Sequence, residues 1–464
     1  MKKIIYILTI SALAAGCEAL DQSPSTSVTT DTAITSVDDL SNAVNGAYYL
    51  ATYGTRLTMA SELAIYGDLV GPDSYQPSSS GQNASRIAQF TMTPNDTYSA
   101  YYYLYSALAS VNCALEKGQE LEDQAGAAPY LAELHAMRGL FHFHLAVLFT
   151  PIPTSGNSNT MGLVLSDRVF DIDYAGARAS LDSTYAFIVN EFTTAIESGL
   201  DMERHTGHLN HWAVLGLRAR ANLYRGHNED ALEDCNEIIE NSPYSLYSRE
   251  EYTKVWSQQG SREMLMEYLQ TDTYNAQRYS PGYYTSPKGY AEYGVKPEFY
   301  HWLVSDPSDI RSLMVADLSI RPEGESDWNA GYFPLKYPGN AGASVPLYVN
   351  NIKVMRLSEI YLIAAEASLK TGRNASVYID TLRSNRIAGY AGGGTITLSD
   401  ILDERRKELF AEGHIAFDFW RNGLSVESSL GPIAPTDYRT VLPIPKEELD
   451  ASKGRLVQNP GYGG

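Results

Sequence analysis

The stretch that decides the fold is HLNHWAVLGLRARANLYRGHNEDALEDCNEIIENSP, residues 208–243. Apolar residues recur in it at intervals of three and four on both sides of Gly226, which predicts two amphipathic helices separated by a tight turn. Each helix pair of this kind exposes an apolar side, so a single pair is unstable and several have to stack. The stretch therefore predicts a mainly α-helical chain built as a scaffold of stacked helix pairs.

A repeat signature supports this prediction. The motif Trp212-x2-Leu215-Gly216 matches the opening of the tetratricopeptide repeat, and the spacing within residues 226–243 fits its second half if the first helix is one turn longer than usual. A second pair is predicted in RLSEIYLIAAEASLKTGRNASVYIDTLRSNR, residues 356–386, where Gly372 separates two helical patterns. The fold class expected is a tetratricopeptide-like helical scaffold with a long irregular insertion.

The composition changes along the 464 residues and suggests five segments. Helical spacing dominates before and after a central block that is rich in Pro, Gly, Ser and Tyr and that holds three of the five tryptophans. A loop region of that length is usually functional or disordered, and its many aromatic residues argue against disorder. We expect a signal peptide over residues 1–16, a lipidated cysteine and tether over 17–31, an N-terminal helical region over 32–243, the loop-rich aromatic insertion over 244–347 and a C-terminal helical region over 348–464.

The N-terminus has the features of a targeting signal. Lys2 and Lys3 precede an apolar run, residues 4–15, that is too short to span a bilayer. The run ends in Ala14-Ala15-Gly16-Cys17, which resembles a bacterial lipobox except that Ala14 stands where Leu, Val or Ile is usual. We expect Cys17 to become the first mature residue and to carry acyl chains that anchor the protein. The alternative is an ordinary secretory signal followed by a chance cysteine.

The charge balance excludes one class of partner. Asp and Glu number 55 and Lys and Arg number 35, which gives a formal net charge of -20. A surface of that sign repels phosphate backbones, so nucleic acid is not an expected partner. Tyrosine (34) outnumbers phenylalanine (12), and tyrosine suits partly solvated positions where its hydroxyl end meets water. This excess indicates a ligand-facing surface.

Eight blocks, in order along the chain, resemble the SusD/RagB family of lipid-anchored nutrient-binding proteins. They are NAVNGAYYLA (42–51), YSAYYYLYSALASVNCALE (98–116), LAELHAMRGLFHFHLAVLFTPIP (131–153), GHLNHWAVLGLRARANLYRG (207–226), IKVMRLSEIYLIAAEA (352–367), ERRKELFAEGHIAFDFWRNG (404–423), LPIPKEEL (442–449) and QNPGY (458–462). The Arg-Trp pair common after Glu-Gly-His in the family is replaced here by Ile415 and Ala416. The resemblance implies an outer-membrane, cell-surface protein that caps a SusC-like TonB-dependent transporter and binds oligosaccharide or polysaccharide.

The tyrosine-rich insertion supplies the expected binding site. Its centre, RYSPGYYTSPKGYAEYG (residues 278–294), contains five tyrosines and fits neither a helix nor a strand pattern. An aromatic ring covers the apolar face of a pyranose while neighbouring polar groups bond its hydroxyl rim. The loop at residues 66–75 and the helix start at 97–105 are expected to join this surface. The candidate ligand-binding residues are Asp68, Asp73, Tyr75, Tyr101, Tyr279, Tyr283, Tyr284 and Trp328.

The sequence gives less support to other functions. It contains no HExxH, G-x-S-x-G, P-loop or G-x-G-x-x-G motif, so we expect no enzyme and no cofactor. The histidine spacings do not suit a metal site, and packing histidines are expected instead. The run DERRKEL, residues 403–409, is most simply a solvated helix with intrahelical charge pairs, although Arg405 and Arg406 could instead pair with the acidic tail of a neighbouring helix. The alternatives that stay open are a peptide-binding member of the same family and a repeat-type assembly adaptor.

Overall fold

The computed structural model describes residues 33–52, 64–96, 98–171, 173–203, 207–257, 260–320 and 329–463. Cys17 and Trp328 lie outside these ranges. Within them the chain is predominantly helical, which confirms the predicted fold class. No helix in the described ranges is long and apolar enough to cross a membrane.

The helices and strands are arranged along the chain as follows. The helices are α2 (Val37–Thr52), α3 (Ala64–Leu69), α4 (Ser85–Ala88), α5 (Ser99–Gly118), α6 (Ala127–Phe149), α7 (Leu181–Glu197), α8 (His211–Arg225), α9 (Asn228–Asn241), α10 (Arg249–Tyr252), α11 (Pro281–Thr285), α12 (Pro297–Val304), α13 (Leu357–Lys370), α14 (Ser376–Ser384), α15 (Leu398–Leu409), α16 (Ile415–Arg421) and α17 (Lys446–Ala451). The strands are β1 (Ser74–Tyr75), β2 (Met264–Tyr268), β3 (Gly294–Val295), β4 (Val315–Leu318), β5 (Gly331–Pro334), β6 (Ile352–Arg356), β7 (Val426–Ser428) and β8 (Gly431–Ile433).

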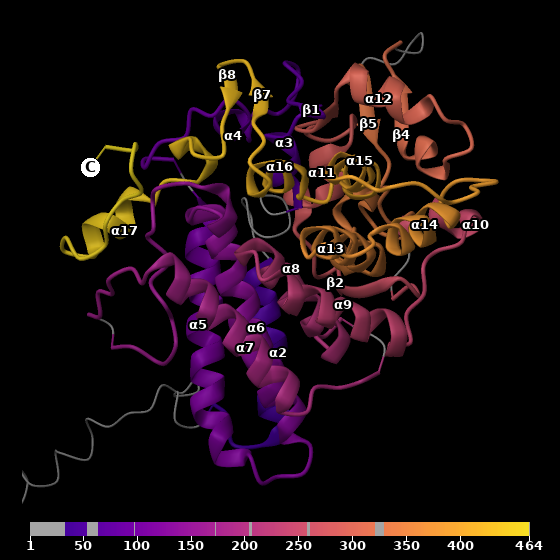
Figure 1. Ribbon diagram of the computed structural model, residues 1–464. Helices are drawn as coiled ribbons and strands as arrows, with labels where there is room; N and C mark the ends of the chain where they lie inside the picture. The colour runs from indigo at the N-terminus through magenta and orange to yellow at the C-terminus, as the bar shows by residue number, and fades with distance from the viewer. Residues whose placement is uncertain are drawn as a thin grey trace, which may run out of the picture.

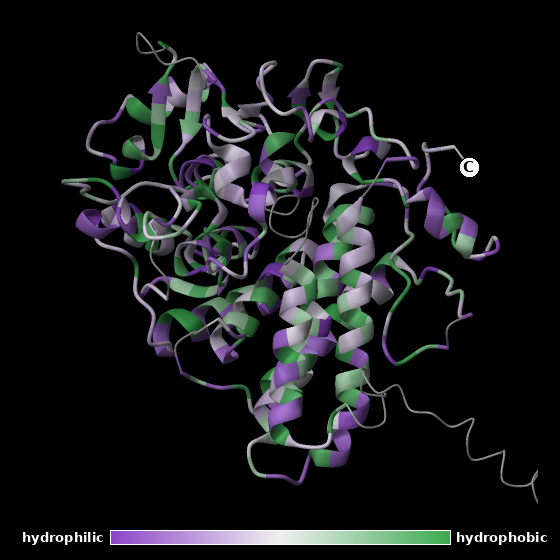
Figure 2. Cartoon of the chain, turned by 180° about the vertical axis from the view of Figure 1, so that it is seen from behind, coloured by the Kyte–Doolittle hydropathy of each residue, from purple (hydrophilic) through white to green (hydrophobic). Residues whose placement is uncertain are grey.

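The long helices α2, α5, α6 and α7 pack side by side in the lower half of Figure 1. Helix α6 is buried over most of its length because α2, α5, α7 and α8 pack around it. Gly139 lets α6 and α7 approach closely, since a Cβ at this position would lie 2.8 Å from the ring of Phe192. Green and purple alternate along these helices in Figure 2, as expected when one side of each faces the core.

The predicted helix pairs are confirmed as α8–α9 and α13–α14, with α13 packed against α9. Gly226 ends α8 in the left-handed region, at φ 77°, where glycine carries no Cβ penalty. Gly216 of the repeat signature lies against α13: a Cβ there would be 2.9 Å from Cδ1 of Ile360. The signature glycine is therefore a requirement of helix packing.

Helix α15 differs from the solvated helix predicted for residues 403–409. Glu404, Arg405 and Glu408 are buried, so that prediction is wrong. The alternative is confirmed for Arg405, which pairs with Asp418 of the neighbouring helix α16 at 2.6 Å. Arg406 pairs instead with Asp73, between α3 and β1, at 2.6 Å and with Asp403 of its own helix at 2.8 Å. Periodicity alone cannot show that the polar side of this helix faces other charged elements.

The charges of α15 belong to a buried network at the end of the β2–β6 pair. Arg356 lies 2.9 Å from Glu263 and 3.1 Å from Glu408, and Arg386 approaches the same two carboxylates at 2.9 and 3.1 Å. All four side chains are 0–1% exposed. Buried charges need partners of this kind because each isolated ion would lose its hydration without compensation.

A small antiparallel sheet joins distant parts of the chain above the helices. Its order is β1-β3-β5-β4, so the N-terminal strand β1 is an edge of a sheet made mainly by the insertion. Ser74 pairs with Val295 and Tyr75 with Gly294. This register brings the loop after β1 next to the tyrosine-rich segment 278–294.

Candidate functional site

Four half-buried tyrosines cluster on the surface of the insertion, and we call them the tyrosine platform. They are Tyr279, Tyr283, Tyr290 and Tyr348. The ring centroid of Tyr283 lies 5.1 Å from that of Tyr290 and 5.4 Å from that of Tyr348, and the rings of Tyr279 and Tyr290 are 6.2 Å apart. Since each ring keeps part of its surface exposed, the platform offers aromatic faces and hydroxyl groups to solvent together.

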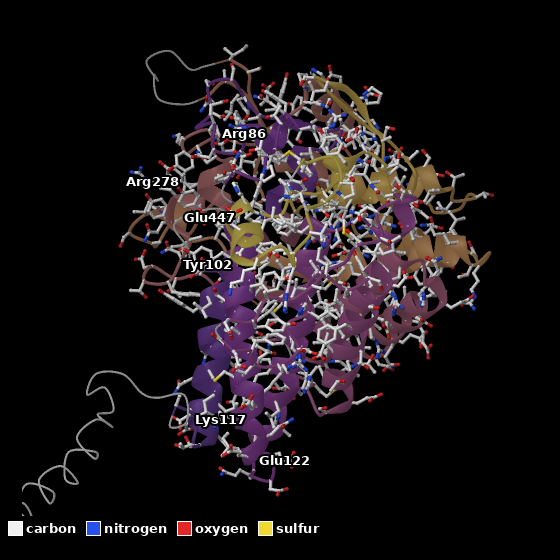
Figure 3. The ribbon with its side chains drawn as sticks, turned by 90° about the vertical axis from the view of Figure 1, so that its left-hand side faces the viewer. Arg86, Tyr102, Lys117, Glu122, Arg278 and Glu447 are labelled. Atoms are coloured by element: carbon white, nitrogen blue, oxygen red, sulfur yellow. The ribbon has the colours of Figure 1, made fainter. Side chains whose placement is uncertain are left out.

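Arg278 is exposed at the edge of the platform, and Figure 3 shows it at the left-hand margin of the molecule. Its Nε donates a hydrogen bond to the hydroxyl of Tyr348 at 3.4 Å. The hydroxyls of Tyr348 and Tyr290 raise the pKa of Arg278 above its usual value, because they accept hydrogen bonds from the charged guanidinium. The guanidinium is thus charged, exposed and oriented by the platform itself.

Hydrogen bonds fix the two segments that carry the platform. Ser280 caps α11 by accepting the backbone N–H of Tyr283, and its own hydroxyl donates to the carbonyl of Leu347 at 2.5 Å. The side chain of Asn350 donates to the same carbonyl at 2.9 Å. Gly282 makes this approach possible, because a Cβ there would lie 2.1 Å from Nδ2 of Asn350. The platform rests on a locally rigid backbone.

Glu292 connects the platform to the loop that follows β1. Its carboxylate is fully buried and accepts the backbone N–H and the side-chain Nδ2 of Asn83 at 2.8 and 2.7 Å. Gln76 Nε2 donates to it at 2.5 Å, and the backbone N–H of Gly81 donates to the carbonyl of Tyr290 at 2.8 Å. The loop 76–84 and the segment 278–294 therefore form one surface.

The candidate tyrosines fall into different environments. Tyr279 and Tyr283 belong to the platform, whereas Tyr284 and Tyr101 are 1% and 4% exposed. Tyr75 is half-buried in β1 with its ring against Gly294, whose added Cβ would lie 2.8 Å from Cε1 of Tyr75. The rings of Tyr284 and Tyr101 are packed rather than open, so the platform has to be built from the other tyrosines.

The two candidate aspartates are buried and hold other elements together. Asp68 accepts the backbone N–H groups of Gly413, His414 and Ile415 at 2.8, 3.2 and 2.9 Å, at the start of α16. Burial raises the pKa of Asp68 to about 7, although these hydrogen bonds act in the opposite direction. Asp73 binds Arg406 with both carboxylate oxygens, at 2.6 and 2.8 Å. Neither carboxylate faces the surface as a ligand group would.

Sequence reasoning did not select several residues that complete this surface: Arg278, Tyr290, Glu292 and Tyr348. The first three lie inside the tyrosine-rich segment, so composition had already marked their location. Tyr348 comes from outside it, and is held at the platform by the bond from Ser280 to Leu347, by the bond from Arg278 to its hydroxyl and by its contact with the ring of Tyr283. Such a long-range contact leaves no periodic signal in the sequence.

A second tyrosine-lined region lies between α5 and α17, and we call it the α5–α17 cleft. It has a volume of about 430 Å³. Its lining includes Tyr98, Tyr102, Tyr103, Pro445, Glu447 and Glu448. Tyr102 is 62% exposed, and Tyr101 lines a neighbouring cavity of about 260 Å³ on the other side of Glu448. In Figure 1, α17 lies well apart from α11, which carries Tyr283 of the platform, so the two regions are distinct.

Histidines and cysteines show no arrangement for metal chemistry in the described ranges. No group of three or more His, Cys, Asp or Glu side chains there is placed to hold a metal ion. The imidazole of His142 is buried and bonded on both nitrogens, to the carbonyl of Arg138 at 2.7 Å and to the backbone N–H of Ser166 at 3.0 Å. Cys235 is buried and Cys113 is half-buried, and both are free thiols.

Comparison with known proteins identifies the family. The SusD family model matches residues 321–436, and a model described as starch-binding associating with outer membrane matches residues 18–223, so the two together cover more than half of the chain. SusD-like protein P2 of Formosa agariphila is 24% identical over 99% of both chains.

Crystal structures share the whole architecture. A SusD superfamily protein from Bacteroides thetaiotaomicron matches with a TM-score of 0.84 and 28% identity, covering 92% of this chain and 100% of that one. A putative sugar binding protein from Bacteroides vulgatus matches with the same TM-score and identity, covering 93% and 100%. The repeat signature, the end-to-end sequence match and the shared fold agree: the chain belongs to the SusD family.

Proposed function

We propose that this protein is a cell-surface glycan-binding subunit that captures oligosaccharide on the tyrosine platform and passes it to a SusC-like TonB-dependent transporter in the outer membrane. The observation that carries the proposal is the platform: half-exposed rings on a fixed backbone beside an oriented arginine. A pyranose presents an apolar C–H face that an aromatic ring covers, and a hydroxyl rim that tyrosine hydroxyls and Arg278 can bond.

The comparisons support the ligand class and the location. One of the two matching family models is described by starch binding and outer-membrane association, and a structural relative at 28% identity is described as a putative sugar binding protein. Lipidation at Cys17 would keep the protein at the membrane after signal cleavage. Binding and delivery, without hydrolysis, is the role that these features support.

The affinity expected of such a surface is modest. Rigid tyrosines lose little conformational entropy on binding, but a flat platform leaves much of the ligand in water. We expect dissociation constants between micromolar and millimolar, which correspond to about 4–8 kcal/mol. A glycan array followed by calorimetry on the purified mature chain measures this directly.

The decisive variant replaces three platform tyrosines together, as Tyr283→Ala, Tyr290→Ala and Tyr348→Ala. We expect it to lose detectable glycan binding because only the ring of Tyr279 remains of the platform. The matched control is Tyr438→Ala, which removes a 43% exposed tyrosine elsewhere on the surface. Glycan binding that survives the triple change and disappears with Tyr102→Ala would move the site to the α5–α17 cleft. Binding of casein-type peptides with none of any glycan would favour the peptide-binding alternative.

Delivery to a transporter is tested separately. The tagged chain, isolated from its native membrane, is expected to carry a TonB-dependent transporter with it at a fixed ratio. Isolation of the chain alone, with glycan binding intact, would contradict the transfer step and leave the binding step in place.

A further inference from the structure

We propose that the platform selects acidic saccharides, with Arg278 as the group that binds a carboxylate or sulfate on the ligand. This inference rests on the proposed function, because it assigns a substrate class to the same site. The argument starts from the position of the guanidinium. Arg278 is exposed, and no carboxylate of the described residues lies within ion-pair distance of it.

Most of the arginines that the structure describes pair with a carboxylate, whereas Arg278, like Arg178, Arg225, Arg249 and Arg455, forms no such pair. Acidic residues outnumber basic ones by 55 to 35, and Arg311, Arg356 and Arg386 each pair with at least two carboxylates. The groups that act on the pKa of Arg278 are instead the uncharged hydroxyls of Tyr348, Tyr290 and Tyr283. The positive charge at the platform is therefore not neutralised by the protein around it.

The nearby carboxylates are already committed to other contacts. Glu292 is fully buried and bonds the loop 76–84. Asp272 accepts the backbone N–H and the hydroxyl of Ser344 at 2.9 and 2.9 Å. Lys288, in the same segment as the platform, is exposed and adds a second positive charge. Neither carboxylate forms an ion pair with Arg278, so the guanidinium can pair with an anionic group on a ligand although the whole chain is negative.

Distant negative charges have little effect on a ligand bound at Arg278. Exposed charges are screened beyond about 8 Å at physiological ionic strength, so a ligand on the platform interacts mainly with the groups beside it. Guanidinium presents five N–H donors in a planar fork, and two tyrosine hydroxyls occupy only part of that capacity. The remaining donors match the paired oxygens of a carboxylate or sulfate.

The chemistry that Arg278 recognises is shared by two kinds of sugar, uronic acids and sulfated sugars. In both, the ring offers an apolar face to the tyrosines while the anionic group projects from its edge. A neutral sugar can stack on the tyrosine rings, but it offers the charged guanidinium only uncharged hydroxyl groups to bond. We expect the acidic ligand to bind about tenfold tighter than its neutral counterpart, as a hydrogen bond to a charged group allows.

The test begins with an array that contains both anionic and neutral glycans, probed with the purified mature chain. The tightest glycan is then compared by calorimetry with its carboxyl-reduced form and its desulfated form. We expect the glycans that bind on the array to be anionic. We also expect either carboxyl reduction or desulfation to weaken binding about tenfold, and the treatment that does so identifies the anionic group as a carboxylate or a sulfate. Binding should weaken further as NaCl rises, because the contact is exposed.

Variants assign the effect to one side chain. Arg278→Gln is expected to remove the preference for the acidic form while keeping the affinity for the neutral form, and Arg278→Lys to keep part of the preference. Arg373→Gln, which changes a 55% exposed arginine paired with Glu229, is the matched control. Neutral array hits, or a preference that survives Arg278→Gln, overturn the inference but not the proposed function. Absence of any glycan binding overturns both.

Discussion

Tyr283 and Tyr284 are neighbours in sequence and have opposite roles in the structure. Tyr283 is half-buried in the platform, and Tyr284 is 1% exposed beneath it. We expect Tyr284→Ala to reduce the free energy of unfolding by about 3–5 kcal/mol, since it leaves a cavity the size of an aromatic ring. Tyr283→Ala should change stability by much less and weaken glycan binding. Urea denaturation and calorimetry on the two variants separate the effects.

Composition predicted the region of the site but not the role of each ring. A loop has no periodicity that would show which of two adjacent tyrosines faces inward, so Tyr283 and Tyr284 were equivalent candidates in the sequence. A joint substitution that included Tyr101 and Tyr284 would be expected to lower the melting temperature as well as the affinity. Equal stability of Tyr283→Ala and Tyr284→Ala would contradict the packing described above.

His142 makes stability depend on pH. Burial lowers its pKa to about 4, against about 6.5 in an unfolded chain. Between these values the unfolded state binds a proton that the folded state does not, so the free energy of unfolding falls as pH falls from about 6.5 to 4. The contribution of this one group is about 3 kcal/mol.

The geometry at His142 explains why the folded state resists protonation. One ring nitrogen faces the carbonyl of Arg138 and the other accepts the backbone N–H of Ser166, so a second proton would face a donor. We expect His142→Gln to flatten the decline in stability between pH 6.5 and 4, measured by denaturation at each pH. The control is His227→Gln, at a 48% exposed histidine. A slope unchanged from that of the wild type would show that other groups cause it.

At the scale of elements, one carboxylate joins the two loops of the surface. Glu292 accepts hydrogen bonds from Asn83, Ala84 and Gln76, all from the loop after β1. Glu292→Gln keeps the size of the side chain but replaces one acceptor oxygen with an NH₂ donor. Buried donors would then face each other, which costs about 1–3 kcal/mol for each group left unsatisfied.

We expect this change to loosen the loop 76–84 and to weaken glycan binding without unfolding the helices. Hydrogen–deuterium exchange should become faster at residues 83 and 84 and stay unchanged in α8 and α13. Glu298→Gln, at an exposed glutamate in the first turn of α12, is the control. Unchanged exchange at residues 83 and 84 would mean that other contacts hold the loop.

The elements differ in how far the sequence could predict them. The pair α8–α9 was predictable because amphipathic spacing and the turn at Gly226 are local signals. The sheet β1-β3-β5-β4 was not, since its strands are two to four residues long and come from distant segments. Helix α15 was placed correctly but its polar side was misjudged, because Asp73 and Asp418 approach it only in the folded chain.

At the scale of the whole molecule, the architecture separates stability from recognition. The helix pairs and the buried network around Arg356 and Glu408 form the scaffold, and the platform lies on an insertion that the scaffold holds in place. A surface of this kind can change its side chains without disturbing the core. Under the proposed function, this surface serves uptake only if the molecule remains beside a transporter, so the proposal makes the expected membrane anchor part of the function.

The last prediction concerns that anchor. We expect Cys17→Ser to abolish acylation, because serine has no thiol for the lipid, and to release the protein from the outer membrane. Labelling with radioactive palmitate and fractionation of cells measure both effects. Cys113→Ser is the matched control, since this half-buried thiol lies in α5 and has no place in the lipobox. Loss of the label with glycan affinity retained by the purified chain would show that anchoring and binding are separate. Absence of the label from the wild-type chain would leave an ordinary secretory signal as the better interpretation of the N-terminus, and persistent labelling of Cys17→Ser would move the acylation to another residue.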